Sequence, residues 1–136
     1  MKSRITPEYV TELKPNEIFV FGSNESGIHG KGAAKMAMQW GAKYGNPEGI
    51  QGSTYAIPTK NKSISKTLEV SEIEVYVNRF IEYALSNPDS IFLVTEIGCG
   101  LAGLTPKQVA PMFKKAISMN NIHLPYRFWH ILSISQ

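Results

Sequence analysis

Two glycine-rich segments have the pattern of phosphate-binding loops. The first glycine turn, residues 22–32 (GSNESGIHGKG), follows the apolar run 18–21. The second glycine turn, residues 98–103 (GCGLAG), follows the apolar run 91–97. A strand, a glycine loop and a helix in succession direct backbone N–H groups and a helix N-terminus at one spot, which attracts anions and above all phosphates. Two such units in one sheet can hold a diphosphate from both sides.

Neither turn matches a familiar nucleotide motif. A P-loop needs Gly, four residues, then Gly-Lys followed by Ser or Thr, and the chain has no such string. Gly30-Lys31-Gly32 opens like a dinucleotide fingerprint, but Lys35 stands where the third glycine belongs. Exposed backbone amides could still bind an anion in both segments. The alternative is that each segment is a compact turn with only a structural role.

The first glycine turn also carries polar side chains suited to a ligand. Asn24 can bind a ribose hydroxyl, or it can shape the loop through an Asx-turn. His29 can donate to a phosphate or act as an acid; the alternative is a solvated loop histidine. Lys31 adds positive potential near phosphates or lies solvated on the surface. The predicted ligand-binding residues of this turn are Gly22, Ser23, Asn24, Gly30, Lys31 and Gly32.

The second glycine turn contributes Gly98, Cys99, Gly100 and Leu101 as predicted ligand-binding residues. As a nucleophile Cys99 would need a histidine base nearby, which the sequence does not reliably supply, so a small buried thiol is the preferred interpretation. The chain has one cysteine, which excludes an intrachain disulfide. His123 and His130 lack metal-ligand spacing with each other and with Cys99, so we predict no metal site.

Hydrophobic patterning predicts the elements that position these turns. Strands are expected at residues 18–21, 54–57, 91–97 and 126–134, and helices at residues 32–44, 70–85 and 105–119. In the second helix we predict Ser71 as the N-cap, Glu74 as its capping-box partner, and Val70 with Val75 as the hydrophobic staple. Residues 105–108 (TPKQ) repeat this start, with Thr105 as the cap.

Strands that alternate with helices predict an α/β fold of three layers, with a mostly parallel mixed sheet covered on both faces. Ligands of such sheets bind beyond the carboxyl ends of the strands, where both glycine turns lie. The length of 136 residues suits a single domain, residues 1–136. Residues 61–67 are the most loop-like internal stretch, and whether they close as a lid is left open.

Composition narrows the class of protein. Hydrophobic residues make up 43% of the chain and charged residues 18%, which favours a real core and argues against disorder. The net charge of +3 without long runs of like charge suits a small anionic ligand, while nucleic acid is an unlikely partner. The chain has no apolar stretch of membrane-spanning length and no signal-peptide core, so we predict a cytoplasmic protein without a membrane partner.

Four strings resemble the macrodomain superfamily. They are residues 20–24 (VFGSN), 29–34 (HGKGAA), 55–60 (YAIPTK) and 96–101 (EIGCGL). The resemblance is greatest to the compact branch containing the terminal ADP-ribose glycohydrolases and to small macro-like proteins of phages and bacteria. It covers most of the chain, and its most specific piece is residues 97–101 followed by a capped helix.

The resemblance implies a three-layer macro-like fold that binds ADP-ribose or a derivative, with no further cofactor. It implies that the first turn lies near the distal ribose and that the second wraps the diphosphate. In the glycohydrolase branch, a lysine at the end of the middle strand attacks the anomeric carbon of the ribose, and Lys60 stands at that position. An aspartate after the Gly-Cys-Gly-Leu run then resolves the lysine adduct.

The chain departs from this pattern at two places. Ala102 occupies the position of the resolving aspartate, so a hydrolase would need Glu25, Glu96 or His29 as the acid–base partner of Lys60. The early acidic residue that holds the adenine edge is also missing, and Glu12 is a weak substitute. Without a resolving acid, Lys60 serves as a cation that balances the phosphates.

Three hypotheses follow. The first is a module that binds ADP-ribose or a related nucleotide diphosphate. The second adds hydrolysis of an ADP-ribosyl bond with Lys60 as the nucleophile. The third is a phage-type accessory protein that acts through a protein partner and has a degenerate pocket.

Overall fold

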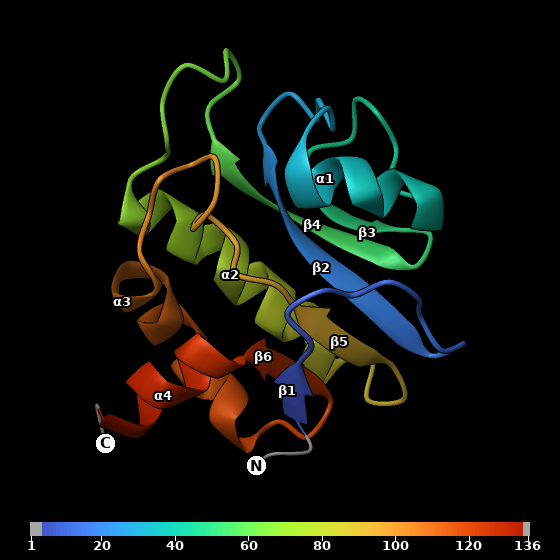
Figure 1. The fold of residues 1–136 in the computed structure, drawn as a ribbon, viewed down its shortest axis with the longest axis vertical. Coiled ribbons are helices and arrows are strands. Elements are labelled where there is room, and N and C mark those ends of the chain that lie inside the picture. The colour runs from blue at the N-terminus through green and yellow to red at the C-terminus, as the bar shows by residue number, and fades with distance from the viewer. Residues whose placement is uncertain (1–3, 135–136) are drawn as a thin grey trace.

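The computed structural model describes residues 4–134, in which six strands form one sheet in the order β1-β6-β5-β2-β4-β3. The strands are β1 (Ile5–Thr6), β2 (Glu17–Asn24), β3 (Gly49–Gln51), β4 (Thr54–Lys60), β5 (Ile91–Val94) and β6 (Ile122–Pro125). All neighbours are parallel except β3 and β4, so the predicted mostly parallel mixed sheet is confirmed (Figure 1).

Helices cover both faces of this sheet. They are α1 (Gly32–Ala37), α2 (Val70–Leu85), α3 (Pro106–Val109) and α4 (Tyr126–Ile134), with the 3₁₀ segments η2 (Met38–Trp40) and η3 (Ala110–Ser118). On β2, Phe19 and Phe21 pack in one core cluster with Ala34 and Ala37 of α1. Val20, pointing to the opposite face, packs in the larger cluster with residues of α2, η3 and α4. The three-layer α/β arrangement is thus confirmed.

Helix α2 has the predicted bounds, but its start chemistry lies two residues earlier than predicted. Glu69, not Ser71, is the N-cap, and its N–H donates to the carboxylate of Glu72 over 2.9 Å. Packing decides the register, because Leu68 and Ile73 flank this cap and both are buried in the core. The predicted staple residues Val70 and Val75 are exposed instead.

The helix that follows the second glycine turn begins as predicted. The Thr105 N–H donates to the side chain of Gln108 over 2.9 Å, and Pro106 is the first helical residue. The α-helix ends at Val109, and η3 then continues to Ser118 with a kink at Phe113. Pro111 lacks the N–H that a regular α-helix needs at this point, which explains the change in form.

The predicted last strand at residues 126–134 is wrong. That segment is helix α4, and the last strand is β6, which ends at Pro125. Phe128 and Leu132, four residues apart, are both buried, whereas Tyr126 and Arg127 are exposed, which is a helical pattern. The aromatic and β-branched composition of the segment favoured a strand, and its spacing was the better signal.

Other boundaries also differ. The first predicted helix ends at Trp40 because Gly41 has a left-handed φ of 109°. Strand β5 stops at Val94 rather than at residue 97. Strand β4 continues through Pro58 to Lys60, since β3 pairs only with its first residues and the missing N–H of the proline is not needed on that side. The very short β1 and β3 were not predicted.

Candidate functional site

The two glycine turns begin side by side at one rim of the sheet. Val20 of β2 pairs with Val94, the last residue of β5, and β2 runs on past its predicted end at Phe21 to Asn24, so Gly22, Ser23 and Asn24 belong to the strand. A Cβ atom placed on Gly22 would lie 3.4 Å from the backbone nitrogen of Gly98. The convergence on which the predicted site depends is therefore present.

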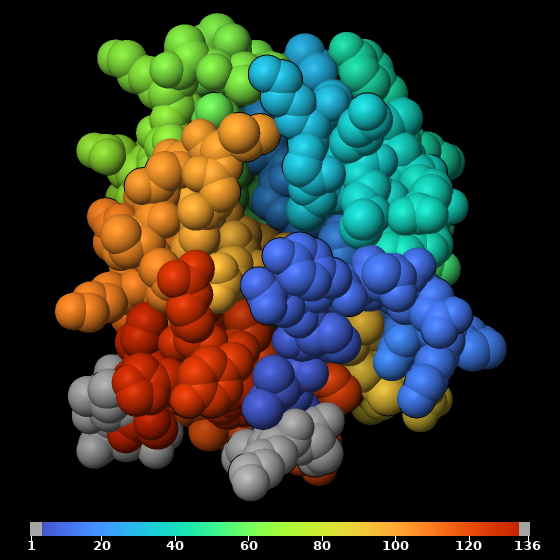
Figure 2. Space-filling view, viewed as in Figure 1, coloured from blue at the N-terminus to red at the C-terminus, as the bar shows by residue number. Residues whose placement is uncertain are grey.

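The turns leave the sheet toward opposite faces. The first leads from β2 to α1, which packs on the face of Phe21. The second leads from β5 to α3 and η3, which pack on the other face. Such a divergence between neighbouring parallel strands opens a crevice beyond their carboxyl ends. Figure 2 shows a groove there, between the second turn in orange and the first turn and α1 in lighter blue and cyan.

The second glycine turn offers unpaired hydrogen-bond donors. Within residues 4–134, the backbone N–H groups of Gly98, Gly100 and Leu101 have no acceptor in the protein. A Cβ on Gly100 would meet nothing within 4 Å, and the side chain of Leu101 is 69% exposed, so this part of the turn borders open space. Free amide donors beside open space can bind an anion.

The source of this anion-binding capacity differs from the prediction. The α-helices that follow the turns, α1 with six residues and α3 with four, are too short for a substantial helix dipole. The available donors are the amides of the turns themselves.

Asn24 is used inside the first turn. Its Oδ1 accepts hydrogen bonds from the Ile28 N–H at 3.0 Å and from the Ser26 hydroxyl at 2.8 Å. Its Nδ2 donates to the Ile28 carbonyl over 2.8 Å. These contacts support the loop-shaping interpretation of Asn24, because both polar atoms of its side chain form hydrogen bonds within the turn. Ser23 is likewise buried, with its hydroxyl donating to the Asn24 carbonyl over 3.3 Å.

The rest of the first turn changes character after Ile28. Within the described part of the chain, the N–H groups of His29, Gly30 and Lys31 have no acceptor. Gly30 and Gly32 border open space, and Lys31 is exposed. His29 is not the solvated histidine of the alternative interpretation, because only 1% of it is exposed.

Lys60 lies one strand away from the first turn. In the parallel pairing of β2 and β4 it stands opposite Asn24, and its carbonyl accepts the N–H of Glu25 over 2.9 Å. Its side chain is half-buried, and within residues 4–134 its ammonium forms no ion pair. It therefore lies at the same rim of the sheet as the first glycine turn.

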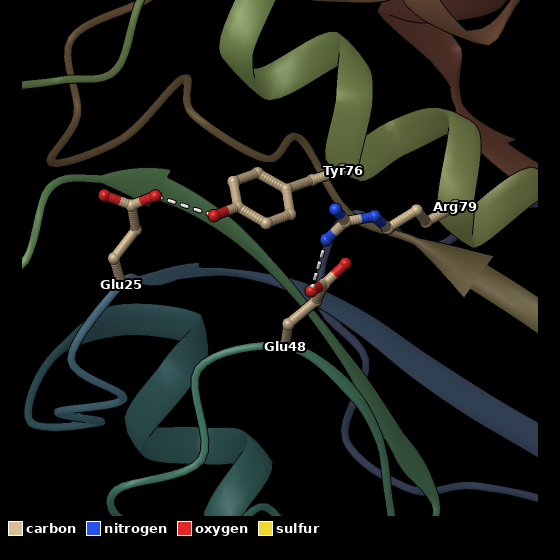
Figure 3. Close-up of polar contacts among 4 residues, drawn as sticks. All are labelled: Glu25, Glu48, Tyr76 and Arg79. Atoms are coloured by element: carbon tan, nitrogen blue, oxygen red, sulfur yellow. Dashed lines mark hydrogen bonds and ion pairs between the residues drawn. The ribbon is translucent and has the colours of Figure 1, made fainter.

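Glu25 is turned toward helix α2. Its carboxylate accepts a hydrogen bond from the Tyr76 hydroxyl over 2.6 Å (Figure 3). This bond, with burial as a second cause, raises the pKa of Tyr76 to about 12. Beside it, Arg79 donates to Glu48 over 2.9 Å, and its guanidinium lies over the Tyr76 ring. The four side chains connect α2 to the first turn and to the segment before β3.

Glu96 belongs to the other side of the site. Its two carboxylate oxygens accept hydrogen bonds from Arg127 at 2.5 and 2.7 Å. Glu96 follows β5 and Lys60 ends β4, with β2 between those strands, so the structure does not bring the two together. Glu25, another of the predicted acid–base residues, is bonded to Lys60 through the backbone, since its N–H donates to the Lys60 carbonyl.

A cavity of about 700 Å³ adjoins the second turn, and sequence reasoning did not predict it. It is lined by Ile5, Thr6, Pro7, Glu8, Thr95, Glu96, Pro125, Tyr126 and Arg127. Glu8, and not Glu12, is the early acidic residue that lines this cavity, and both residues are exposed. The cavity was not predicted for two reasons. Strand β1 has only two residues, which is too short for a periodic pattern, and residues 126–134 were assigned to a strand.

Cys99 is a half-buried thiol that packs against the core. Burial raises its pKa to about 11, and the nearby Glu96 carboxylate adds to the effect while Arg127 opposes it. A thiol with this pKa is almost wholly protonated at neutral pH and is a poor nucleophile. The predicted small thiol is therefore an unreactive one, but it is half-buried rather than fully buried.

Residues 61–67 are tied to the second turn. The Thr67 hydroxyl donates to the carbonyl of Ala102 over 2.5 Å. Asn61 organises the loop from within, because its Oδ1 accepts the N–H groups of Ser65 and Lys66. The loop therefore forms a wall next to the second turn.

Comparison with protein-family models, with curated proteins and with solved structures gave no match to the chain. Among the helices of residues 4–134, none is long and apolar enough to cross a membrane.

Proposed function

We propose that the protein binds ADP-ribose or a related nucleotide diphosphate, with the diphosphate between the two glycine turns. The observation that supports this most directly is the juxtaposition of Gly22 and Gly98, which places unpaired amides of the second turn beside the first. The N–H groups of Gly98, Gly100 and Leu101 bind the phosphate oxygens on one side. The N–H groups of Gly30 and Lys31 bind them on the other.

The adjoining cavity accommodates the nucleoside end of this ligand. Thr95 and Glu96 line the cavity and lead directly into the second turn, so one molecule can reach both places. A volume of about 700 Å³ falls within the usual range of small-molecule sites. This arrangement agrees with the function that the resemblance to macrodomains implies.

Hydrolysis of an ADP-ribosyl bond is the second candidate function. It is favoured by the position of Lys60 at the same rim, with no ion pair to another described residue. Glu25 is the nearest carboxylate along the backbone, and Tyr76 holds it. Removal of ADP-ribose from a modified protein by the wild type, and its loss in Lys60→Ala, would support this function; equal rates would remove Lys60 from the mechanism.

Calorimetric titration with ADP-ribose tests the binding proposal. Gly100→Val is the informative variant, because a side chain at this position fits the backbone yet projects into the crevice. We expect saturable binding by the wild type, loss of binding in Gly100→Val and unchanged binding in the control Ser86→Val, at the exposed end of α2. No heat and no thermal shift with millimolar ADP-ribose would overturn the proposal.

The same variant separates binding from the accessory-protein alternative. A protein that acts through a partner and has a degenerate pocket would keep its biological effect in Gly100→Val. A protein that acts by binding a nucleotide would lose that effect together with the heat of binding.

A further inference from the structure

The buried side chain of His29 has no hydrogen-bond partner. Both ring nitrogens are inaccessible to solvent, and neither has a partner among the described residues. The ring packs edge-to-face against Phe21, with 5.3 Å between the centroids. A neutral imidazole carries one N–H donor and one nitrogen acceptor, and burying them without partners destabilises the protein.

The backbone before His29 is held by hydrogen bonds, whereas the backbone after it is not. Before it, Ile28 is held through both its N–H and its carbonyl by Asn24. After it, the N–H groups of Gly30 and Lys31 have no acceptor within the described residues, and both Gly30 and Gly32 border open space. Two glycines allow the segment 29–31 to rotate at little steric cost.

We propose that the side chain of His29 is buried beneath the first turn in the ligand-free protein. When ligand binds, this side chain rotates outward and donates a hydrogen bond to an anionic oxygen of the ligand. The inference rests on the proposed function and adds to it a side-chain donor and a change of conformation. Release from Phe21 ends the burial of two unpaired nitrogens, and the phosphate supplies the acceptor that the interior lacks.

The proposal predicts that one substitution changes stability and affinity in opposite directions. Phe at position 29 keeps the ring contact with Phe21 and removes the unpaired nitrogens, so His29→Phe is expected to raise the melting temperature of the free protein. The same variant cannot donate to the ligand, so it is expected to bind ADP-ribose about tenfold more weakly.

The test combines thermal denaturation without ligand and calorimetry with ADP-ribose. His29→Gln retains a side-chain donor and is expected to bind more tightly than His29→Phe, which keeps the proposal testable if one variant folds poorly. His130→Gln, which removes an exposed histidine outside the turns, serves as the control and should match the wild type in affinity.

The outcomes separate this proposal from the function on which it rests. If the wild type binds ADP-ribose and His29→Phe binds it equally well, the role of His29 is wrong while the function stands. If His29→Phe is both weaker in binding and less stable, the nitrogens already have partners in the free protein and the proposal fails. If the wild type does not bind ADP-ribose, the proposed function itself fails.

Discussion

The Tyr76 hydroxyl and the Glu25 carboxylate are joined by a hydrogen bond of 2.6 Å, which connects the middle of α2 to the start of the first glycine turn. Glu25 follows directly on β2 and Tyr76 lies 51 residues later in the chain. Arg79 and Glu48 repeat the connection beside it (Figure 3). The first half of the turn is thereby fixed, in contrast to the segment that carries His29.

This bond makes stability depend on pH in the alkaline range. The pKa of Tyr76 is raised from an ordinary value of 10 to about 12, so the bond's contribution is complete below pH 10 and is lost as pH rises toward 12. We expect Tyr76→Phe to lose less of its free energy of unfolding over this interval than the wild type. Urea denaturation of both proteins across the interval measures the difference. The pKa of Tyr55 is also raised to about 12, but Tyr55 contributes equally to both proteins and so cancels in the comparison. Parallel curves would contradict the prediction.

Two glycines of the second turn should respond differently to alanine. Gly98 has a φ of +74°, and a Cβ there would lie 3.0 Å from Leu104, so Gly98→Ala is expected to lower the free energy of unfolding by about 1–3 kcal/mol. Gly100 has neither constraint, and Gly100→Ala should stay within about 1 kcal/mol of the wild type. Chemical denaturation of the two variants provides a matched comparison. Equal losses would show that the turn has another backbone conformation.

Cys99 should react slowly with alkylating reagents. Its pKa of about 11 leaves little thiolate at neutral pH, so we expect alkylation by iodoacetamide at least about tenfold slower than in the unfolded chain. Mass spectrometry of the intact protein measures the rate, and Cys99→Ser should remain unmodified. A rate in the folded protein equal to that in denaturant would contradict the raised pKa of this half-buried thiol.

Lys60 should contribute to ADP-ribose affinity through its charge. Because the lysine is partly exposed, Lys60→Ala is expected to weaken binding only about two- to fivefold and to reduce its dependence on salt. Calorimetry at two salt concentrations measures both effects. Lys115→Ala, an exposed lysine of η3, should bind like the wild type. A loss far beyond tenfold would give Lys60 a more specific role than charge.

The fold and the rim of the site could be predicted because their signals are local. The buried run before Gly22 and the run before Gly98 each define a parallel strand, and parallel strands place their carboxyl ends together. The capping box at Thr105 could also be predicted, because it depends on residues only three positions apart. At Glu69 local chemistry was ambiguous, and only the tertiary burial of Leu68 and Ile73 selects the register.

The side-chain roles were harder to predict because they depend on contacts across the fold. Asn24 stands at the expected place, yet its amide group is used by Ser26 and Ile28. Glu96 binds Arg127, which lies in the segment wrongly assigned to a strand. Its separation from Lys60 could therefore not be predicted from the sequence. The burial of His29 against Phe21 likewise has no sequence signal, since loop histidines are usually solvated.

The unpaired donors of the second glycine turn are peptide groups, and this determines which experiments can detect their contribution. Truncating the side chain of Leu101 leaves its N–H in place, so systematic alanine replacement is blind to any contact that this amide makes. Ester substitution of individual peptide bonds, or added bulk at Gly100, is the appropriate probe. For the same reason, the side chains along this turn can be substituted during evolution without loss of the backbone donors.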